Sequence, residues 1–427
     1  MITVGLDFGT HQTKVCVEHK EGNELRYEFC KFTDNNGKPQ YTIPSLICID
    51  EQGFLSYGYE AVSKLNSSDN RDATNTVVKY FKQAVFTNQD ISLTFNEAMI
   101  LSIWYLAYLL FDLQERYGKD FTTQIGVPAD GQTMKQKREL ATCLLLSAFR
   151  LVELEFNNDK SAFLNTCISD LRKITKIDPF SEDKKSYYGI LVFPEAYACL
   201  LPLVKNRKID TGMSLMVDIG GGTTDISFFT IENARPQVYG FYSVDKGLNF
   251  LTNASVTKSR VSTNIESASE ILPHRIPPFE NEIKQKCIKN KKKLDRAFYD
   301  YVNLPHSNLN RVLENRPIIY TGGGSVFHRL RSPYLGFKDV IHVSRNNWRS
   351  ECVENIDEIS KLALCPILST AYGLAVSMTD DNIKCKAFNK IFSECPQKGT
   401  NQPKKLNSRF GSALGSFDYA DDWDALK

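Results

Sequence analysis

The sequence lacks an excess of charge of either sign: 52 lysine and arginine residues and 50 aspartate and glutamate residues leave a formal net charge of +2. A chain without a basic field has no general electrostatic attraction for nucleic acid or an anionic membrane. Long hydrophobic runs are absent as well. The most apolar stretch without a charge, residues 98–111, is shorter than the roughly 18 residues of a membrane-spanning helix and predicts a buried helix. We therefore expect neither nucleic acid nor a membrane as a partner.

Cysteine pairs with metal-binding spacing are also missing. The 11 cysteines are odd in number and include no C-x-x-C pair, which is typical of scattered core thiols rather than of a disulfide framework or a zinc site. The N-terminus has neither a basic start nor a long apolar core, so no signal peptide is indicated. These features favour a cytoplasmic location. With 427 residues, 42% of them hydrophobic, the chain can form two or more domains.

The most informative motif is V-D-I-G-G-G-T-T-D-I-S at residues 217–227. Strand-forming residues flank three consecutive glycines, a pattern that predicts a strand–turn–strand hairpin. Glycine lets backbone N–H groups approach an anion without a Cβ in the way, and the carboxylates of Asp218 and Asp225 could hold a hydrated Mg²⁺ or orient a water molecule. Thr223 adds a hydroxyl donor. The alternative is a plain glycine hairpin, but the two aspartates favour phosphate binding.

A second motif of this kind lies near the N-terminus. An apolar run is followed by D-F-G-T at residues 7–10 and then by another predicted strand. Asp7 ends the first strand, Gly9 and Thr10 form the turn, and Lys14 could reach a phosphate as a point charge. Alone, this motif also fits an ordinary hairpin. Together, the two acidic–glycine–threonine hairpins predict the two sides of one polyphosphate site.

The segments around these motifs alternate between strand and helix patterns. Strands are predicted at residues 2–6, 14–18, 43–49, 123–128, 189–193 and 318–320, and helices at 96–117, 136–150, 280–296 and 369–378. Lys79 and Lys82 stand among apolar residues and are expected to be snorkelling surface lysines. Residues 157–185 are polar and less periodic, and we expect a peripheral insertion. The six lysines of the helix at 280–296 are expected on a solvated face.

Two further segments carry ligand-binding signals. Glu195 stands in the first turn of a predicted small-residue helix that directly follows a strand. The strand at 318–320 runs into T-G-G-G-S at 321–325 and then into a helical pattern. A strand, glycines and a helix start are a common way to bring backbone close to a nucleotide.

The pattern changes at residue 379, after which Lys, Asn, Gly, Pro and Ser dominate, and residues 398–416 are predicted to be a linker. Residues 417–426 alternate acidic and aromatic side chains. This end is either a frayed tail or a short motif that docks on a partner protein.

The order of these signatures resembles the actin-like ATPase superfamily, and most closely the nucleotide-binding part of the seventy-kilodalton heat-shock chaperones. The resemblance covers roughly residues 1–378 and rests on G-L-D-F-G-T (5–10), Y-T-I-P-S (41–45), N-T-V-V-K (75–79), I-G-V-P-A (125–129), P-E-A-Y-A (194–198), V-D-I-G-G-G-T-T-D-I-S (217–227), T-G-G-G-S (321–325) and A-Y-G-L-A-V (371–376). Residues 247–317 are short for the extra subdomain of those chaperones, and no segment after 378 has the pattern of their β-rich peptide-binding domain. Lys14 and the short second lobe are similar to bacterial actin-like filament proteins instead.

The resemblance implies an α/β, two-lobed actin-like ATPase fold with duplicated mixed sheets flanked by helices and a nucleotide cleft between the lobes. Lobe I would comprise residues 1–205, completed by 365–378, and lobe II residues 206–364. Residues 379–427 would be a flexible C-terminal tail.

The resemblance also implies a site for ATP or ADP with Mg²⁺. Asp7 and Asp218 would hold hydrated Mg²⁺. Glu195 and Asp225 would orient the attacking water, and Lys79 would reach the γ-phosphate. Further residues would contact the phosphates (Gly9, Thr10, Lys14, Gly220, Gly221, Gly222 and Thr223, the last also catalytic) and the adenosine (Gly322, Gly323 and Gly324). Such hydrolysis requires positioning, charge neutralisation and an oriented water rather than a covalent nucleophile.

The leading hypothesis is an ATP-binding, slowly ATP-hydrolysing, chaperone-like molecular switch that closes on ATP and acts on an unidentified partner protein. One alternative is an ATP-dependent actin-like filament protein of the cytoskeletal or plasmid-partition type. Another is a nucleotide-sensing pseudo-ATPase scaffold. A sugar kinase ranks last, because no acceptor-binding element is evident.

Overall fold

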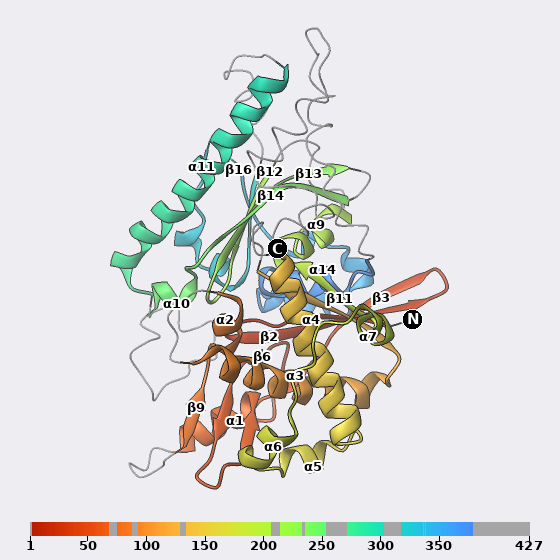
Figure 1. Cartoon of the computed structure of the whole chain (residues 1–427). Coiled ribbons are helices and arrows are strands. Elements are labelled where there is room, and N and C mark those ends of the chain that lie inside the picture. The colour runs from red at the N-terminus through yellow and green to blue at the C-terminus, as the bar shows by residue number, and fades with distance from the viewer. Residues whose placement is uncertain are drawn as a thin grey trace.

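The computed structural model describes residues 2–67, 75–87, 93–128, 134–205, 214–232, 235–252, 271–302, 317–335, 337 and 339–378. Over these residues the chain is a mixed α/β structure with two large sheets and helices on their faces (Figure 1). The predicted linker at 398–416 and the docking motif at 417–426 lie outside the described residues.

The first large sheet is built mainly from the N-terminal half of the chain. Its strand order is β11 (Ile190–Pro194), β10 (Phe121–Val127), β1 (Ile2–Asp7), β2 (Gln12–Glu21) and β3 (Glu24–Phe29), with the short strand β6 (Ile43–Pro44) also paired to β2. Strands β1, β10 and β11 are parallel, whereas β2 is antiparallel to β1 and to β3.

The second large sheet has the order β14 (Arg235–Val244), β13 (Thr224–Glu232), β12 (Ser214–Ile219), β15 (Pro317–Thr321) and β16 (Asp339–His342). Strands β12, β15 and β16 are parallel, and β13 is antiparallel to β12 and to β14. Each sheet therefore consists of a three-stranded antiparallel meander, β1–β2–β3 or β12–β13–β14. The first strand of each meander also pairs, on its other edge, with a parallel strand, to which a second parallel strand is added. The β1–β2 and β12–β13 hairpins, both predicted from glycine motifs, occupy equivalent places in the two sheets.

The predicted strand at 43–49 is divided into two pieces. Strand β6 ends at Pro44, and β7 (Ile47–Ile49) pairs instead with β8 (Leu55–Tyr57) and β9 (Thr76–Val78). The strand is interrupted at residues 45 and 46, because the Ser45 N–H donates to the His11 carbonyl and the Leu46 N–H donates to the carbonyl of Pro44, two residues earlier in the chain. Proline itself has no N–H to continue a ladder.

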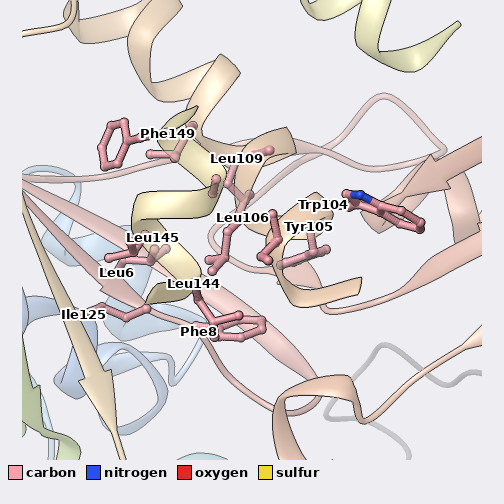
Figure 2. Close-up of a cluster of buried hydrophobic side chains, with 14 of the residues drawn as sticks. Leu6, Phe8, Trp104, Tyr105, Leu106, Leu109, Ile125, Leu144, Leu145 and Phe149 are labelled. Atoms are coloured by element: carbon pink, nitrogen blue, oxygen red, sulfur yellow. The ribbon is translucent and has the colours of Figure 1, made fainter. Parts of the chain in front are cut away.

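The outer face of the first sheet is covered by α3 (Phe95–Tyr117) and α4 (Met134–Arg150), as both helical patterns predicted. Helix α3 begins at a capping box in which the Thr94 hydroxyl accepts from the Glu97 N–H and the Glu97 carboxylate accepts from the Thr94 N–H. Figure 2 shows the core between these helices and β1, with Leu106, Leu144, Leu6 and Phe8 among its side chains. Among the described helices, none combines the length and the apolar character that crossing a membrane requires.

Three helices lie at a core shared by both sheets: α8 (Glu195–Ala198), α9 (Leu201–Lys205) and α14 (Cys365–Ala375). Met216 and Ile319 of the second sheet belong to the same buried cluster as the α14 residue Leu374. Helix α14 lies directly on β1, since a Cβ added at Gly5 would come within 2.2 Å of the Ala375 nitrogen. The helix begins four residues before the predicted start, with proline in its first turn, a position that favours proline.

The other face of the second sheet is covered by α10 (Leu248–Leu251) and the long α11 (Ile276–Val302), which runs along the sheet (Figure 1). The alternation along β12 explains this arrangement. Leu215 and Val217 belong to the cluster that contains Phe279 and Ile283 of α11, whereas Met216 faces the core shared with the first sheet.

The predicted peripheral insertion at 157–185 is in part a core element. It forms α5 (Lys160–Leu164), α6 (Ile168–Ile174) and α7 (Glu182–Tyr187). Phe163 and Leu171 are buried in the first sheet's core, and the Trp104 Nε1–H of α3 donates to the Thr175 hydroxyl at 2.8 Å. Two buried residues on two different short helices produce no helical period, so the sequence pattern did not reveal them.

The helix predicted after residues 321–325 is wrong. Two 3-10 turns follow, at Gly323–Val326 and His328–Leu330, and Phe327 between them is extended. The remaining elements are short and connect the parts described above: β4 (Phe32–Thr33), β5 (Pro39–Gln40), α1 (Gly58–Ser67), α2 (Phe81–Phe86), the π-helical turn Leu151–Glu155, the 3-10 turns Pro273–Arg275, Arg345–Asn347 and Ser350–Cys352, and α13 (Ile356–Lys361).

Candidate functional site

Four carboxylates stand at the strand ends of the two large sheets. Asp7 ends β1, Glu195 directly follows β11, and Asp218 lies near the end of β12 in register with Asp225 on β13. The carboxyl ends of parallel strands are where open α/β sheets bind ligands. All four residues are buried, with at most 8% of their surface exposed. The predicted acidic residues of both hairpins are therefore inside the protein rather than on a solvated turn.

Two lysines accompany these acids. The Lys14 Nζ lies 2.9 Å from Asp7 Oδ2, and the Lys82 Nζ lies 2.6 Å from Glu195 Oε1 and 5.8 Å from the centre of the Phe8 ring. Burial alone would lower the pKa of Lys82, but the carboxylates of Glu195, Asp7 and Asp225 outweigh it and raise that pKa. Lys82 is thus a charged, buried ammonium group.

The second hairpin holds two carboxyl groups that resist ionisation. Burial, followed by the nearby charges of Glu195 and Asp7, raises the pKa of Asp218 to about 7. Burial, Glu195 and Asp218 raise the pKa of Asp225 well above its ordinary range. One carboxylate oxygen of Asp225, Oδ1, is buried and has no hydrogen-bond partner among the described residues. A bound cation would favour the ionised form of both carboxyl groups, and Asp225 Oδ1 can accept a hydrogen bond from a donor such as water.

The charge balance of the cluster fits a hydrated divalent cation. Four acidic side chains stand with two lysine side chains, and burial together with the nearby acids Glu195 and Asp7 raises the pKa of Asp218. Within the described residues, no three His, Cys, Asp or Glu side chains are arranged to ligate a metal directly. Carboxylate oxygens are the ligand type that Mg²⁺ prefers, usually one or two of them with the rest of the ligands being water.

The glycine turn of the second hairpin is anchored from the side of α10. The Gly220 N–H donates to the Thr223 carbonyl at 2.9 Å, which closes the turn. The Leu248 N–H donates to the Gly220 carbonyl at 3.0 Å, and the Asn249 N–H donates to the Gly221 carbonyl at 2.8 Å. The carbonyl groups of Gly220 and Gly221 are thus bound by α10, and these glycines have no side chain on the face that is turned to the first hairpin.

The loop predicted to contact adenosine lies against the same turn. Gly322 has φ +81°, and its N–H donates to the Pro366 carbonyl at 2.9 Å. A Cβ at Gly322 would lie 2.2 Å from Asp218 Oδ1, and one at Gly324 would lie 2.2 Å from the Ile219 side chain. At Gly323 the nearest atom would be 3.7 Å away. The structure thus brings two of these three glycines directly to the second hairpin.

The turn residues of the two hairpins are accessible only in part. Thr10 and Thr223 are half-buried, and the carbonyl of Gly9 accepts from the Ser45 hydroxyl at 2.7 Å. A Cβ at Gly9 would lie 3.2 Å from the Lys14 Nζ. The backbone of Gly9 therefore lies beside the Lys14 ammonium group at the first turn. Gly222 is buried, with the Gln83 side chain against its Cα.

The expectation that Lys82 lies on the surface is wrong. Lys82 pairs with the Glu195 carboxylate, whereas Lys79, the lysine predicted to reach a phosphate, is half-buried with a pKa lowered by burial. A pattern of lysines among apolar residues does not reveal which one meets a carboxylate 113 residues away. Two more residues were missed: His11 of the first turn and Asn249 of α10, which form a hydrogen bond with each other.

Comparison with known proteins gives little beyond this geometry. No family model matches the chain, and no curated protein matches it. Among solved structures, the chain is similar to MreB5 of Spiroplasma citri bound to ADP, with a TM-score of 0.31 and 14% sequence identity. The match covers 58% of this chain and 52% of that chain, so this protein spans about half the length of its structural neighbour.

Proposed function

We propose that this chain binds ATP and ADP with Mg²⁺ between the β1–β2 and β12–β13 hairpins and is an actin-like ATPase. The observation that supports this most is the equivalence of the two hairpins: the same turn, in the same place of two sheets with the same strand order, carries an acidic residue followed by glycine and threonine. In this proposal the two sheets belong to two lobes, residues 1–205 with 365–378 and residues 206–364.

The proposed roles follow from charge and position. Lys14 and Lys82 offer positive charge to the phosphates, and Asp7 and Asp218 hold a hydrated Mg²⁺, which would neutralise phosphate charge when bound. Asp225 Oδ1 is the free acceptor that can orient the attacking water, and the raised pKa of Asp225 suits a group that accepts its proton. Glu195 is held in place by its ion pair with Lys82, and its negative charge helps to keep the pKa of Asp225 raised.

Phosphate release from ATP tests this assignment. The wild-type protein is expected to release phosphate slowly and only with Mg²⁺, and Asp225→Asn is expected to lose roughly 100-fold or more of this rate while it still binds nucleotide, because general base catalysis contributes about that much. The matched control is Asp178→Asn, a buried aspartate that pairs with Lys184 away from the site. Equal rates in wild type and Asp225→Asn would contradict the catalytic role. Binding without any release would favour a nucleotide-sensing scaffold.

What the protein does with ATP binding and hydrolysis is a separate proposal. A nucleotide-dependent switch that acts on a partner protein, in the manner of a chaperone, requires closure of the hairpins on ATP. A filament protein is the second candidate, because the Lys14–Asp7 ion pair places a lysine at the first turn, the feature in which this chain resembles bacterial actin-like filament proteins. Sedimentation after addition of MgATP separates the two: pelleting favours the filament, and a soluble protein favours the switch.

A further inference from the structure

A histidine joins the two hairpins at their turns. His11 follows the first turn, and its ring lies against the second turn: a Cβ added at Gly221 would come within 2.5 Å of His11 Cδ2. On another side, the centres of the His11 and Tyr80 rings are 5.6 Å apart.

Asn249 is the partner of this histidine and is itself held firmly. Its backbone N–H donates to the Gly221 carbonyl at 2.8 Å, so the residue moves with the second hairpin. Its side-chain Oδ1 accepts a hydrogen bond from His11 Nε2, which assigns the ring proton to Nε2. Its Nδ2 donates to Gln83 Oε1 at 3.3 Å. Gln83 is on α2, which lies next to α10 (Figure 1).

We propose that His11, Asn249 and Gln83 form a clasp that joins the two hairpins beside the glycine turn and must open for a phosphate-bearing ligand to enter or leave. The clasp connects three segments, namely the first turn, α2 and the start of α10. Its His11 ring covers Gly221, the backbone that a phosphate would approach under the proposed function, on which this part of the inference rests.

The residue types suit a contact that opens and closes. His11 is exposed and Asn249 is half-buried, so water can replace their mutual hydrogen bond when the turns separate. Gln83, by contrast, is only 4% exposed and packs its side-chain amide against Gly222. The buried glutamine thus holds Asn249 in place, and the exposed histidine is the part of the clasp that moves. His11 acts as a positioning residue in this account.

The kinetics of a fluorescent ATP analogue test the clasp. His11→Ala and Asn249→Ala are each expected to accelerate both association and dissociation roughly 5-fold, the change that corresponds to one neutral hydrogen bond. The double variant is expected to be no faster than Asn249→Ala alone, because that single variant already removes the bond to His11 as well as the bond to Gln83. His19→Ala is the matched control, since His19 on β2 pairs with Glu28 and has no place in the clasp. Unchanged rates, or independent effects that multiply in the double variant, would overturn the proposal.

A measurement without nucleotide separates the clasp from the proposed function. Amide hydrogen exchange of residues 220–224 in the ligand-free protein is expected to be faster in His11→Ala than in wild type, and His11→Gln, which keeps a donor, is expected to restore part of the protection. Faster exchange in a protein that binds no nucleotide would support the clasp and refute the nucleotide site. Nucleotide binding with unchanged exchange in both variants would refute the clasp alone.

Discussion

Replacement of Lys82 by methionine is the sharpest structural perturbation of the candidate site. Lys82 is 5% exposed, and its Nζ lies 2.6 Å from the Glu195 carboxylate. Removal of one partner of a buried ion pair usually costs about 3–5 kcal/mol, because the other charge is left unpaired. In this protein Glu195 would remain beside Asp218 and Asp225, whose buried carboxyl groups already repel one another's charge. The expected loss in the free energy of unfolding is therefore at the upper end of that range.

Urea unfolding at pH 8, followed by tryptophan fluorescence, measures this loss. Lys79→Met is the matched control and is expected to change the unfolding free energy by less than about 1 kcal/mol, since Lys79 is half-buried and Glu195 is paired by Lys82 instead. The double variant Lys82→Met/Glu195→Gln should recover most of the loss, because the unpaired charge is gone. Equal effects of Lys82→Met and Lys79→Met, or no recovery in the double variant, would refute the assignment of Lys82 to the carboxylate cluster.

Two further predictions concern the second hairpin and its neighbour loop. The pKa of Asp218 is raised from 3.8 to about 7, so the ligand-free folded state holds this proton more tightly than the unfolded chain. The stability that this group adds is complete below pH 3.8 and is lost as the pH rises through about 7, a difference on the order of 4 kcal/mol at about 1.4 kcal/mol per pH unit. Asp218→Asn should reduce the slope of urea unfolding measured from pH 4 to 8, part of which remains because the raised pKa of Asp225 contributes with the same sign, and an unchanged slope would count against the buried carboxyl group. Gly322→Ala should lower stability by roughly 1–3 kcal/mol, because φ +81° disfavours a side chain and the new Cβ would meet Asp218, while Gly323→Ala, with nothing closer than 3.7 Å, should be neutral. Equal thermal midpoints of the two alanine variants would contradict the placement of this loop.

The sequence predicted the two hairpins well because their signals are local. Glycines between two apolar runs mark a turn whatever the rest of the chain does, and the register follows: Asp7 lies opposite Lys14, and Asp218 lies opposite Asp225. The convergence of the acids could be expected only through the family resemblance, since no local pattern places Glu195 beside a hairpin residue.

What the sequence did not reveal depends on contacts between distant segments. A buried lysine and a surface lysine look alike in a short apolar stretch, and only the Glu195 carboxylate distinguishes Lys82. The His11–Asn249 bond joins residues 238 positions apart, and neither belongs to a recognised motif. Phe163 of the insertion is buried by packing against the first sheet's core, which a polar, weakly periodic sequence does not show.

The thermal midpoint with and without MgATP tests the central claim most directly, because a ligand that binds only the folded state raises its stability. At 100 times the dissociation constant the gain is about 2.7 kcal/mol, and the midpoint of wild type is expected to rise by at least about 3 °C. Asp218→Ala is expected to show no rise, since it removes one of the carboxylates proposed to hold Mg²⁺. No rise in wild type, or an equal rise in Asp218→Ala, would contradict a nucleotide site between the two hairpins.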